Sequence, residues 1–128
     1  MKRKLHNGII KHDTQKVKNI LNYTIENKII LELNEKDDDG WYPLLEASFE
    51  ENIEIVKLLI NYATENKFIL ELNEKNKYGW YPLLKATSKN NIEIVQLLID
   101  YATKNKIILN LNEKDICGLS TFRSHFKK

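Results

Sequence analysis

Few side chains of this chain belong to the types that carry out covalent chemistry. The 128 residues include only three histidines and one cysteine. His6, His12 and His125 lie far apart in sequence, and Cys117 has no adjacent base to activate its thiol. The chain has no glycine-rich phosphate loop and no His-x-x-x-His spacing. We therefore expect no enzymatic activity and no cofactor, and we interpret the histidines as solvated surface residues.

Metal binding also lacks a ligand pattern. Asp37, Asp38 and Asp39 are consecutive acids, whereas a calcium loop places alternating oxygen ligands over about twelve residues. A single cysteine excludes an internal disulfide framework and leaves no thiolate set for a structural zinc. We predict no metal site.

The charge is small overall but uneven along the chain. The net charge of +2 is the sum of +4 over residues 1–33, −7 over 34–72, +3 over 73–111 and +2 over 112–128. The acidic middle interrupts the continuous basic face that a nucleic-acid surface needs. No apolar run approaches the roughly 18 residues of a membrane helix, and charge returns at Lys11 before a signal-peptide core develops. We expect a cytoplasmic protein that binds neither nucleic acid nor membrane.

Two long segments of the chain are copies of each other. Residues 34–72 and 73–111 align at an offset of 39 residues, with 26 of 39 positions identical. Residues 16–33 resemble the second half of this unit, Leu5 falls opposite Leu44, and residues 112–128 resemble the beginning of the unit. We therefore predict one repeat domain over residues 1–128, made of two whole repeats between an N-terminal and a C-terminal partial repeat.

Each unit contains the signals for a turn and two helices. Asp or Asn stands three residues before Gly at 37–40, 76–79 and 115–118, which predicts a tight turn with Gly at positive φ. Pro43 suits the first position of a short helix, about 43–50, and Asn52 can cap a second helix with helical apolar spacing. The second unit predicts the same elements, with a short helix at about 82–89. Such pairs bury their apolar faces by stacking, so the predicted fold is an all-α solenoid.

These residues resemble the ankyrin repeat family. The family pattern of a turn, a Pro-Leu step, an Ala and a Val-x-x-Leu-Leu helix is matched by Pro43-Leu44, Ala47 and 55–59, and again by Pro82-Leu83, Ala86 and 94–98, with Ile in place of the Val. The period of 39 exceeds the family's 33, and we interpret the added residues after Ala63 and Ala102 as an extended second helix. A HEAT-like helical repeat is the alternative. The Gly that usually separates the two helices of the family is Glu51 or Asn90 here.

The resemblance implies binding of another protein through the turn tips and first helices, which line a concave face in the family. Eight of the 13 positions at which the two whole units differ fall between 37 and 51. The expected contact set is Asp38, Asp39, Trp41, Phe49, Glu50, Lys77, Tyr78, Trp80, Ser88 and Lys89. The acidic middle unit suggests a partner with a basic epitope; the alternative is that oppositely charged units attract one another.

Trp41 and Trp80 occupy the same position in the two units. The resemblance places them at protruding turn tips, where Trp often anchors a partner. The alternative is that each ring packs against Tyr42, Tyr78 or Tyr81 and stiffens the stack. Exposed rings could also stack on sugars, which gives a carbohydrate-binding alternative. A further alternative is a structural segment that assembles head-to-tail through the ends of the stack. The predicted function is a non-catalytic protein-interaction scaffold.

Overall fold

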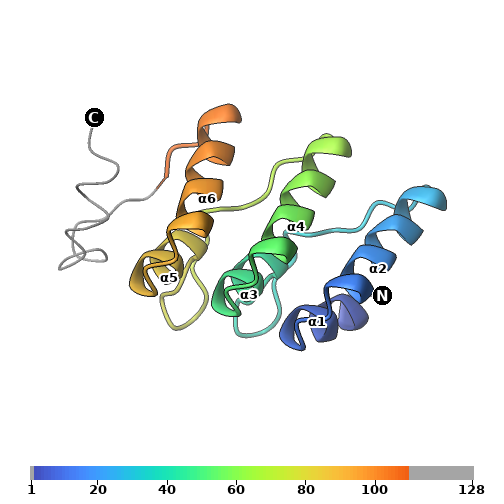
Figure 1. Cartoon of the computed structure of the whole chain (residues 1–128), viewed down its shortest axis with the longest axis horizontal. Helices are drawn as coiled ribbons and strands as arrows, with labels where there is room; N and C mark the ends of the chain where they lie inside the picture. Colours follow the sequence, from blue (N-terminus) through green and yellow to red (C-terminus); the bar gives the residue numbers. More distant parts are fainter. Residues whose placement is uncertain (1, 110–128) are drawn as a thin grey trace.

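Three helix pairs stand side by side along the long axis of the molecule (Figure 1). The computed structural model describes residues 2–109, which form six helices and no strand. The helices are α1 (Lys2–Ile10), α2 (Thr14–Glu26), α3 (Pro43–Phe49), α4 (Ile53–Glu65), α5 (Pro82–Ser88) and α6 (Ile92–Lys104). The all-α solenoid is confirmed. The predicted turn at 115–118, the partial repeat 112–128, Cys117 and His125 lie outside the described residues.

The start of each helix follows from local chemistry. Pro43 is the first residue of α3. An N–H at this position would have no hydrogen-bond partner within the helix, so the lack of an N–H in proline costs nothing there. The side chain of Asn52 accepts a hydrogen bond from the backbone N–H of Ile55 at 3.0 Å, and Asn91 accepts one from Ile94 at 3.1 Å. These contacts satisfy N–H groups that have no partner in the first turn. The predicted caps of α4 and α6 are confirmed.

The predicted extension of the second helix is wrong beyond its first two residues. α4 ends at Glu65 and α6 at Lys104, so only 64–65 and 103–104 of the added residues are helical. Lys67 then takes φ = 58°, and the backbone N–H of Phe68 bonds the carbonyl of Ala63 at 3.1 Å. This left-handed residue closes the helix as Gly commonly does elsewhere. The remaining added residues lengthen the segment that returns to the next turn.

The first 33 residues hold a complete helix pair, α1 and α2, and not a second helix alone. Leu5 of α1 and Leu44 of α3 are each 1% exposed, as expected from their matching repeat positions.

The link between the two helices of each pair has one residue in the left-handed backbone conformation, although that residue is not a glycine. His12, Glu51 and Asn90 occupy this position, with φ of 57°, 53° and 55°. This conformation is unfavourable for residues other than Gly, because the β-carbon crowds the following carbonyl. The link therefore forms at the cost of local strain.

The core runs continuously between the pairs. Leu45, Ala47, Ile55 and Leu59 are fully buried, and α3 contacts α5 as α1 contacts α3. Leu58 and Leu84, both expected in the interior from the repeat pattern, are only partly buried, as is Leu97, the counterpart of Leu58. Ala47 and Ala86 are completely enclosed, in accord with a close approach of neighbouring helices there.

The return segments are joined to one another by asparagine side chains. The Asn34 amide donates to the carbonyl of Ile69 at 2.7 Å and accepts from the N–H of Glu71 at 2.8 Å. Asn73 repeats the first contact with the carbonyl of Ile108 at 2.8 Å. The added residues are therefore a hydrogen-bonded part of the stack.

Candidate functional site

The predicted contact residues lie on one surface, formed by the turn tips and the first helices. We call it the tip face and define it by residues 37–50 and 76–89, which include helices α3 and α5. The Asp37 carboxylate fixes its tip by accepting from the N–H groups of Asp39 and Trp41, each at 2.9 Å, and Gly40 has φ = 88°. Asn76 holds the second tip in the same way through Tyr78 and Trp80. The turn prediction is confirmed for both tips.

Adjacent tips are in direct contact. The N–H of Lys77 donates to the carbonyl of Asp39 at 2.9 Å, and the two side chains form an ion pair at 2.8 Å. A β-carbon at Gly40 would lie 2.7 Å from the Cα of Asn76. Hydrogen bonding to Asp39 raises the pKa of the exposed Lys77 ammonium. The tips are therefore held in a fixed mutual position.

Trp41, Phe49 and Trp80 form an aromatic cluster across two units. The ring centroids of Trp41 and Phe49 are 4.7 Å apart, those of Phe49 and Trp80 are 5.4 Å apart, and both pairs meet edge to face. All three rings are partly buried against the core. The tryptophans therefore pack through Phe49; Tyr42 and Tyr81, the tyrosines expected beside them, are buried in the core.

Lys85 completes the aromatic cluster, and the predicted contact set omitted it. Its ammonium lies 4.2 Å from the Phe49 ring centroid and 4.9 Å from that of Trp80. Desolvation, followed by the nearby Lys89 charge, lowers the pKa of Lys85. The sequence signal was the change from Glu46 to Lys85 at one repeat position, but it does not reveal the ring contacts.

The acidic side chains of the middle unit are paired with its neighbours. His12 Nε2 lies 2.9 Å from a Glu50 oxygen, and His6 forms an ion pair with Glu46. Glu46 is buried, and burial raises the pKa of its carboxyl despite the opposing effect of His6. His6 and His12 lie at the surface, as expected, and each is about half exposed; each also bonds across a unit boundary, which the sequence did not indicate.

The remaining predicted contact residues are accessible. Tyr78 is 61% exposed, and Asp38, Ser88 and Lys89 are also exposed. Beside Trp41, an open pocket of 520 Å³ lies between α1 and the first tip, with His6, Glu46 and Tyr42 in its lining. The tip face thus combines a half-buried aromatic centre with an exposed charged margin.

Within residues 2–109, no three His, Cys, Asp or Glu side chains are grouped so that they could hold a metal ion. No helix in the same range is long and apolar enough to cross a membrane.

Comparison with known proteins addresses the family directly. A family model described as ankyrin repeats (3 copies) matches residues 5–108, a range that begins within α1 and extends past the end of α6. No curated protein matches the sequence. The family match covers most of the chain, and the helix pairs, turn tips and stacking fit it. The chain belongs to the ankyrin repeat family.

Proposed function

We propose that this chain is a non-catalytic interaction module that binds another protein through its tip face. Ankyrin repeats are generally protein–protein interaction modules, and the family match supports this class of function. The observation that supports the proposed surface is the aromatic cluster of Trp41, Phe49 and Trp80, which spans two units and is partly open to solvent.

The aromatic cluster suits a binding centre on physical grounds. The edge-to-face contacts restrain the three rings before a partner arrives, so little side-chain freedom is lost on binding. Trp side chains at the centre of an interface remove a large area from water and are enriched among residues that dominate affinity. The exposed residues around the cluster, Asp38, Tyr78, Ser88 and Lys89, would form the polar rim.

The ion pairs change the chemistry expected of the partner. A basic epitope would compete with His12 for Glu50 and with Lys77 for Asp39. These contacts favour the view that oppositely charged units attract one another. We therefore propose that an apolar or aromatic anchor of the partner on the aromatic cluster contributes most of the affinity, while charge adjusts the rate of association.

The two alternative functions have less support. Stacking on sugar needs an open ring face, but the Lys85 ammonium lies over the Trp80 ring. Head-to-tail assembly needs an apolar face on the first unit. Lys16 and Asn19 there replace Ile55 and Leu58, the corresponding residues of α4.

The test is quantitative affinity capture from native extract, with partners identified by mass spectrometry. The parent chain should enrich a partner that Trp41→Ala plus Trp80→Ala enriches at least about tenfold less, because two interface anchors are removed. Tyr23→Ala is the matched control, since it deletes an exposed aromatic side chain outside the tip face. Equal recovery by folded parent and double variant would refute the proposed surface.

A further inference from the structure

A row of exposed isoleucines repeats along the return segments. Ile30, Ile69 and Ile108 are 80%, 50% and 87% exposed, and they stand 39 residues apart. We call them the isoleucine row. Repeated exposure of a large apolar side chain at one position of every unit gains nothing for an isolated chain, because the hydrophobic effect rewards its removal from water.

Two members of the isoleucine row have a fixed backbone. The carbonyl of Ile69 accepts from the Asn34 amide at 2.7 Å, and the carbonyl of Ile108 accepts from the Asn73 amide at 2.8 Å. The Asn34 side chain also accepts from the N–H of Glu71. Ile69 and Ile108 therefore lose little backbone freedom when another surface covers them.

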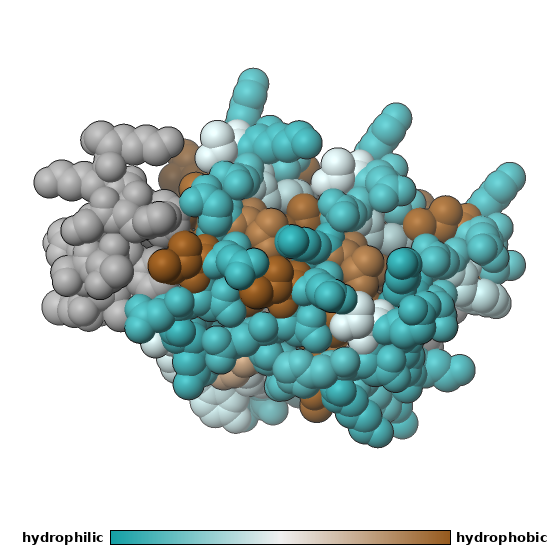
Figure 2. All heavy atoms as spheres, in the orientation of Figure 1, coloured by the Kyte–Doolittle hydropathy of each residue, from teal (hydrophilic) through white to brown (hydrophobic). Residues whose placement is uncertain are grey.

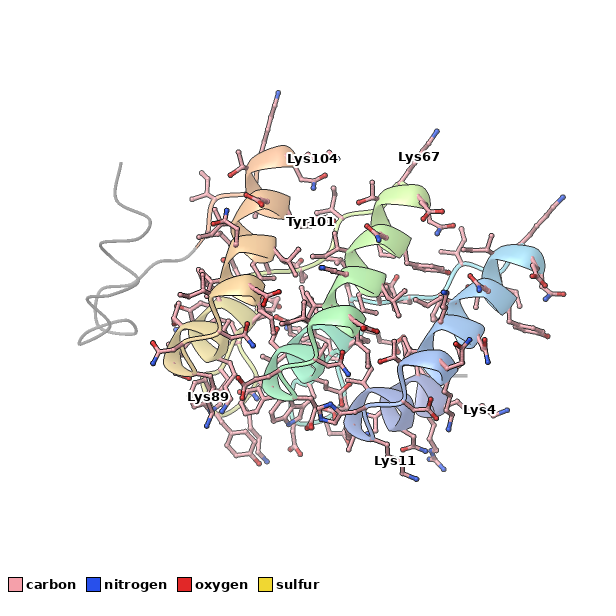
Figure 3. The ribbon with its side chains drawn as sticks, viewed as in Figure 1. Lys4, Lys11, Lys67, Lys89, Tyr101 and Lys104 are labelled. Atoms are coloured by element: carbon pink, nitrogen blue, oxygen red, sulfur yellow. The ribbon has the colours of Figure 1, made fainter. Side chains whose placement is uncertain are left out.

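The isoleucine row is remote from the tip face. Each of its members follows the C-terminal end of a second helix, whereas the tips precede the first helices. In Figure 3, Lys67 and Lys104 project from the upper edge of the molecule, where α4 and α6 end, while Lys11 and Lys89 lie at the lower edge. Figure 2 shows mainly hydrophilic side chains on the face between, with hydrophobic ones grouped in its middle.

The two surfaces also differ in how their residues vary between units. On the tip face, Glu46, Phe49 and Glu50 become Lys85, Ser88 and Lys89. The isoleucine row keeps its residue in all three units, although exposure leaves packing within the chain with little influence there. A surface with one repeated side chain at a fixed step is complementary to another surface with the same step, and a second copy of this chain supplies one.

Charges beside the isoleucine row determine the orientation of that second copy. The first unit carries Glu26, Lys28 and Glu32, a net −1, and the last carries Lys104 and Lys106, a net +2. All five side chains are exposed, and none forms an ion pair within residues 2–109. An antiparallel arrangement places the acidic end of one row against the basic end of the other, whereas a parallel arrangement opposes like charges at both ends. The middle unit, with exposed Glu65, Lys67 and Glu71 at a net −1, faces its own copy in either arrangement, so the ends decide the orientation.

We propose that the isoleucine row is the interface of an antiparallel homodimer. Two-fold symmetry would place Ile69 of each copy at the axis and pair Ile30 of one copy with Ile108 of the other. The tip faces of both copies would stay open, so the dimer would present two binding surfaces to partners.

Sedimentation velocity of the full chain over a wide concentration range tests the dimer. The parent should pass from monomer to dimer and stop there. Ile69→Glu should raise the dissociation constant of the dimer at least about tenfold. The symmetric interface contains the substitution twice, and a loss of about 1.4 kcal/mol of binding free energy is sufficient for a tenfold change. Ile30→Glu and Ile108→Glu, at the more exposed positions, serve the same purpose if Ile69→Glu does not fold. Ile92→Glu changes an isoleucine that is 41% exposed at the other end of α6, and it should leave the constant unchanged.

Charge reversal tests the orientation. Glu26→Lys with Glu32→Lys should weaken the dimer, as should Lys104→Glu with Lys106→Glu, and the four changes together should restore it. A parent that stays monomeric at every concentration would overturn the proposal. So would open-ended growth beyond dimer, which indicates head-to-tail stacking, or a dimer that the substitutions in the row leave unchanged. None of these results depends on whether the tip face binds a partner.

Discussion

The Tyr62 hydroxyl lies 2.7 Å from the Thr24 hydroxyl and joins the second unit to the first. Thr24 donates to the carbonyl of Leu21 at 2.7 Å, so Tyr62 donates to Thr24 and accepts from the N–H of Leu31 at 3.3 Å. Tyr101 repeats the last contact with Leu70 at 3.0 Å. One tyrosine per stacked unit thus satisfies a buried N–H of the unit before it.

Removal of this hydroxyl should destabilise the fold. Tyr62→Phe leaves the Leu31 N–H without its partner, so the free energy of unfolding should fall by about 1–3 kcal/mol. Tyr101→Phe should have a similar effect. Tyr23→Phe is the control, because Tyr23 is 51% exposed and its change should stay within about 0.5 kcal/mol. Urea unfolding measures all three, and an equal loss in all three variants would contradict the assignment.

Gly40 should tolerate a side chain less well than Gly79. Both have φ = 88°, which costs an alanine roughly 1–2 kcal/mol. At Gly40 the new methyl would also lie 2.7 Å from the Cα of Asn76, whereas no described atom lies within 4 Å of it at Gly79. Gly40→Ala should therefore lower the melting temperature by more than Gly79→Ala in calorimetry. The reverse order would argue against direct contact of the tips.

Glycine should stabilise the strained link between the helices. Glu51 is exposed and has φ = 53°, so Glu51→Gly relieves steric strain at the cost of unfolded-chain entropy, for a net gain of about 0.5–1 kcal/mol. Asn90→Gly should gain less, because Asn tolerates this conformation better. Glu54→Gly within α4 is the opposite control and should lose about 1 kcal/mol. A loss of stability in Glu51→Gly on denaturant unfolding would refute this reading of the turn.

The buried Glu46 makes stability depend on pH. Burial raises the pKa of its carboxyl above the ordinary 4.5, and His6 lowers it only in part. The folded protein therefore binds this proton more tightly, so the contribution of Glu46 is fully present below about pH 4.5 and is lost as pH rises through the folded pKa. Glu46→Gln should gain stability relative to the parent between about pH 4 and about pH 7. Urea unfolding at both pH values measures the difference in the free energy of unfolding between Glu46→Gln and the parent, with the exposed Glu54→Gln as control. A difference that becomes less favourable to Glu46→Gln as the pH rises would contradict a raised pKa of Glu46.

The elements of this fold could be predicted wherever a local signal marks them. Pro43 marks the start of α3, Asn52 marks the cap of α4, and Gly40 marks the tip, and each signal acts within a few residues. The end of α4 was mispredicted because a lysine, Lys67, takes the left-handed conformation that Gly would have signalled. Because lysine rarely adopts the left-handed conformation, its presence at position 67 does not indicate a helix end there.

The contacts of the candidate site could not be predicted from the sequence. The repeat differences single out Phe49 and Glu50, which are Ser88 and Lys89 in the next unit. They did not reveal that Phe49 lies between two tryptophans, or that His12 reaches Glu50. These contacts join residues from different units, so they depend on how one unit stacks on the next, which no local pattern encodes.

Hydrogen–deuterium exchange of the chain, alone and bound to its captured partner, tests the proposed binding surface most directly. We predict slower exchange on binding in residues 37–50 and 76–89, with the return segments 29–33 and 68–72 unchanged at matched protein concentration. Protection confined to the return segments would contradict binding through the tip face. So would the same protection of residues 37–50 and 76–89 when the partner is added to the variant Trp41→Ala plus Trp80→Ala as when it is added to the parent.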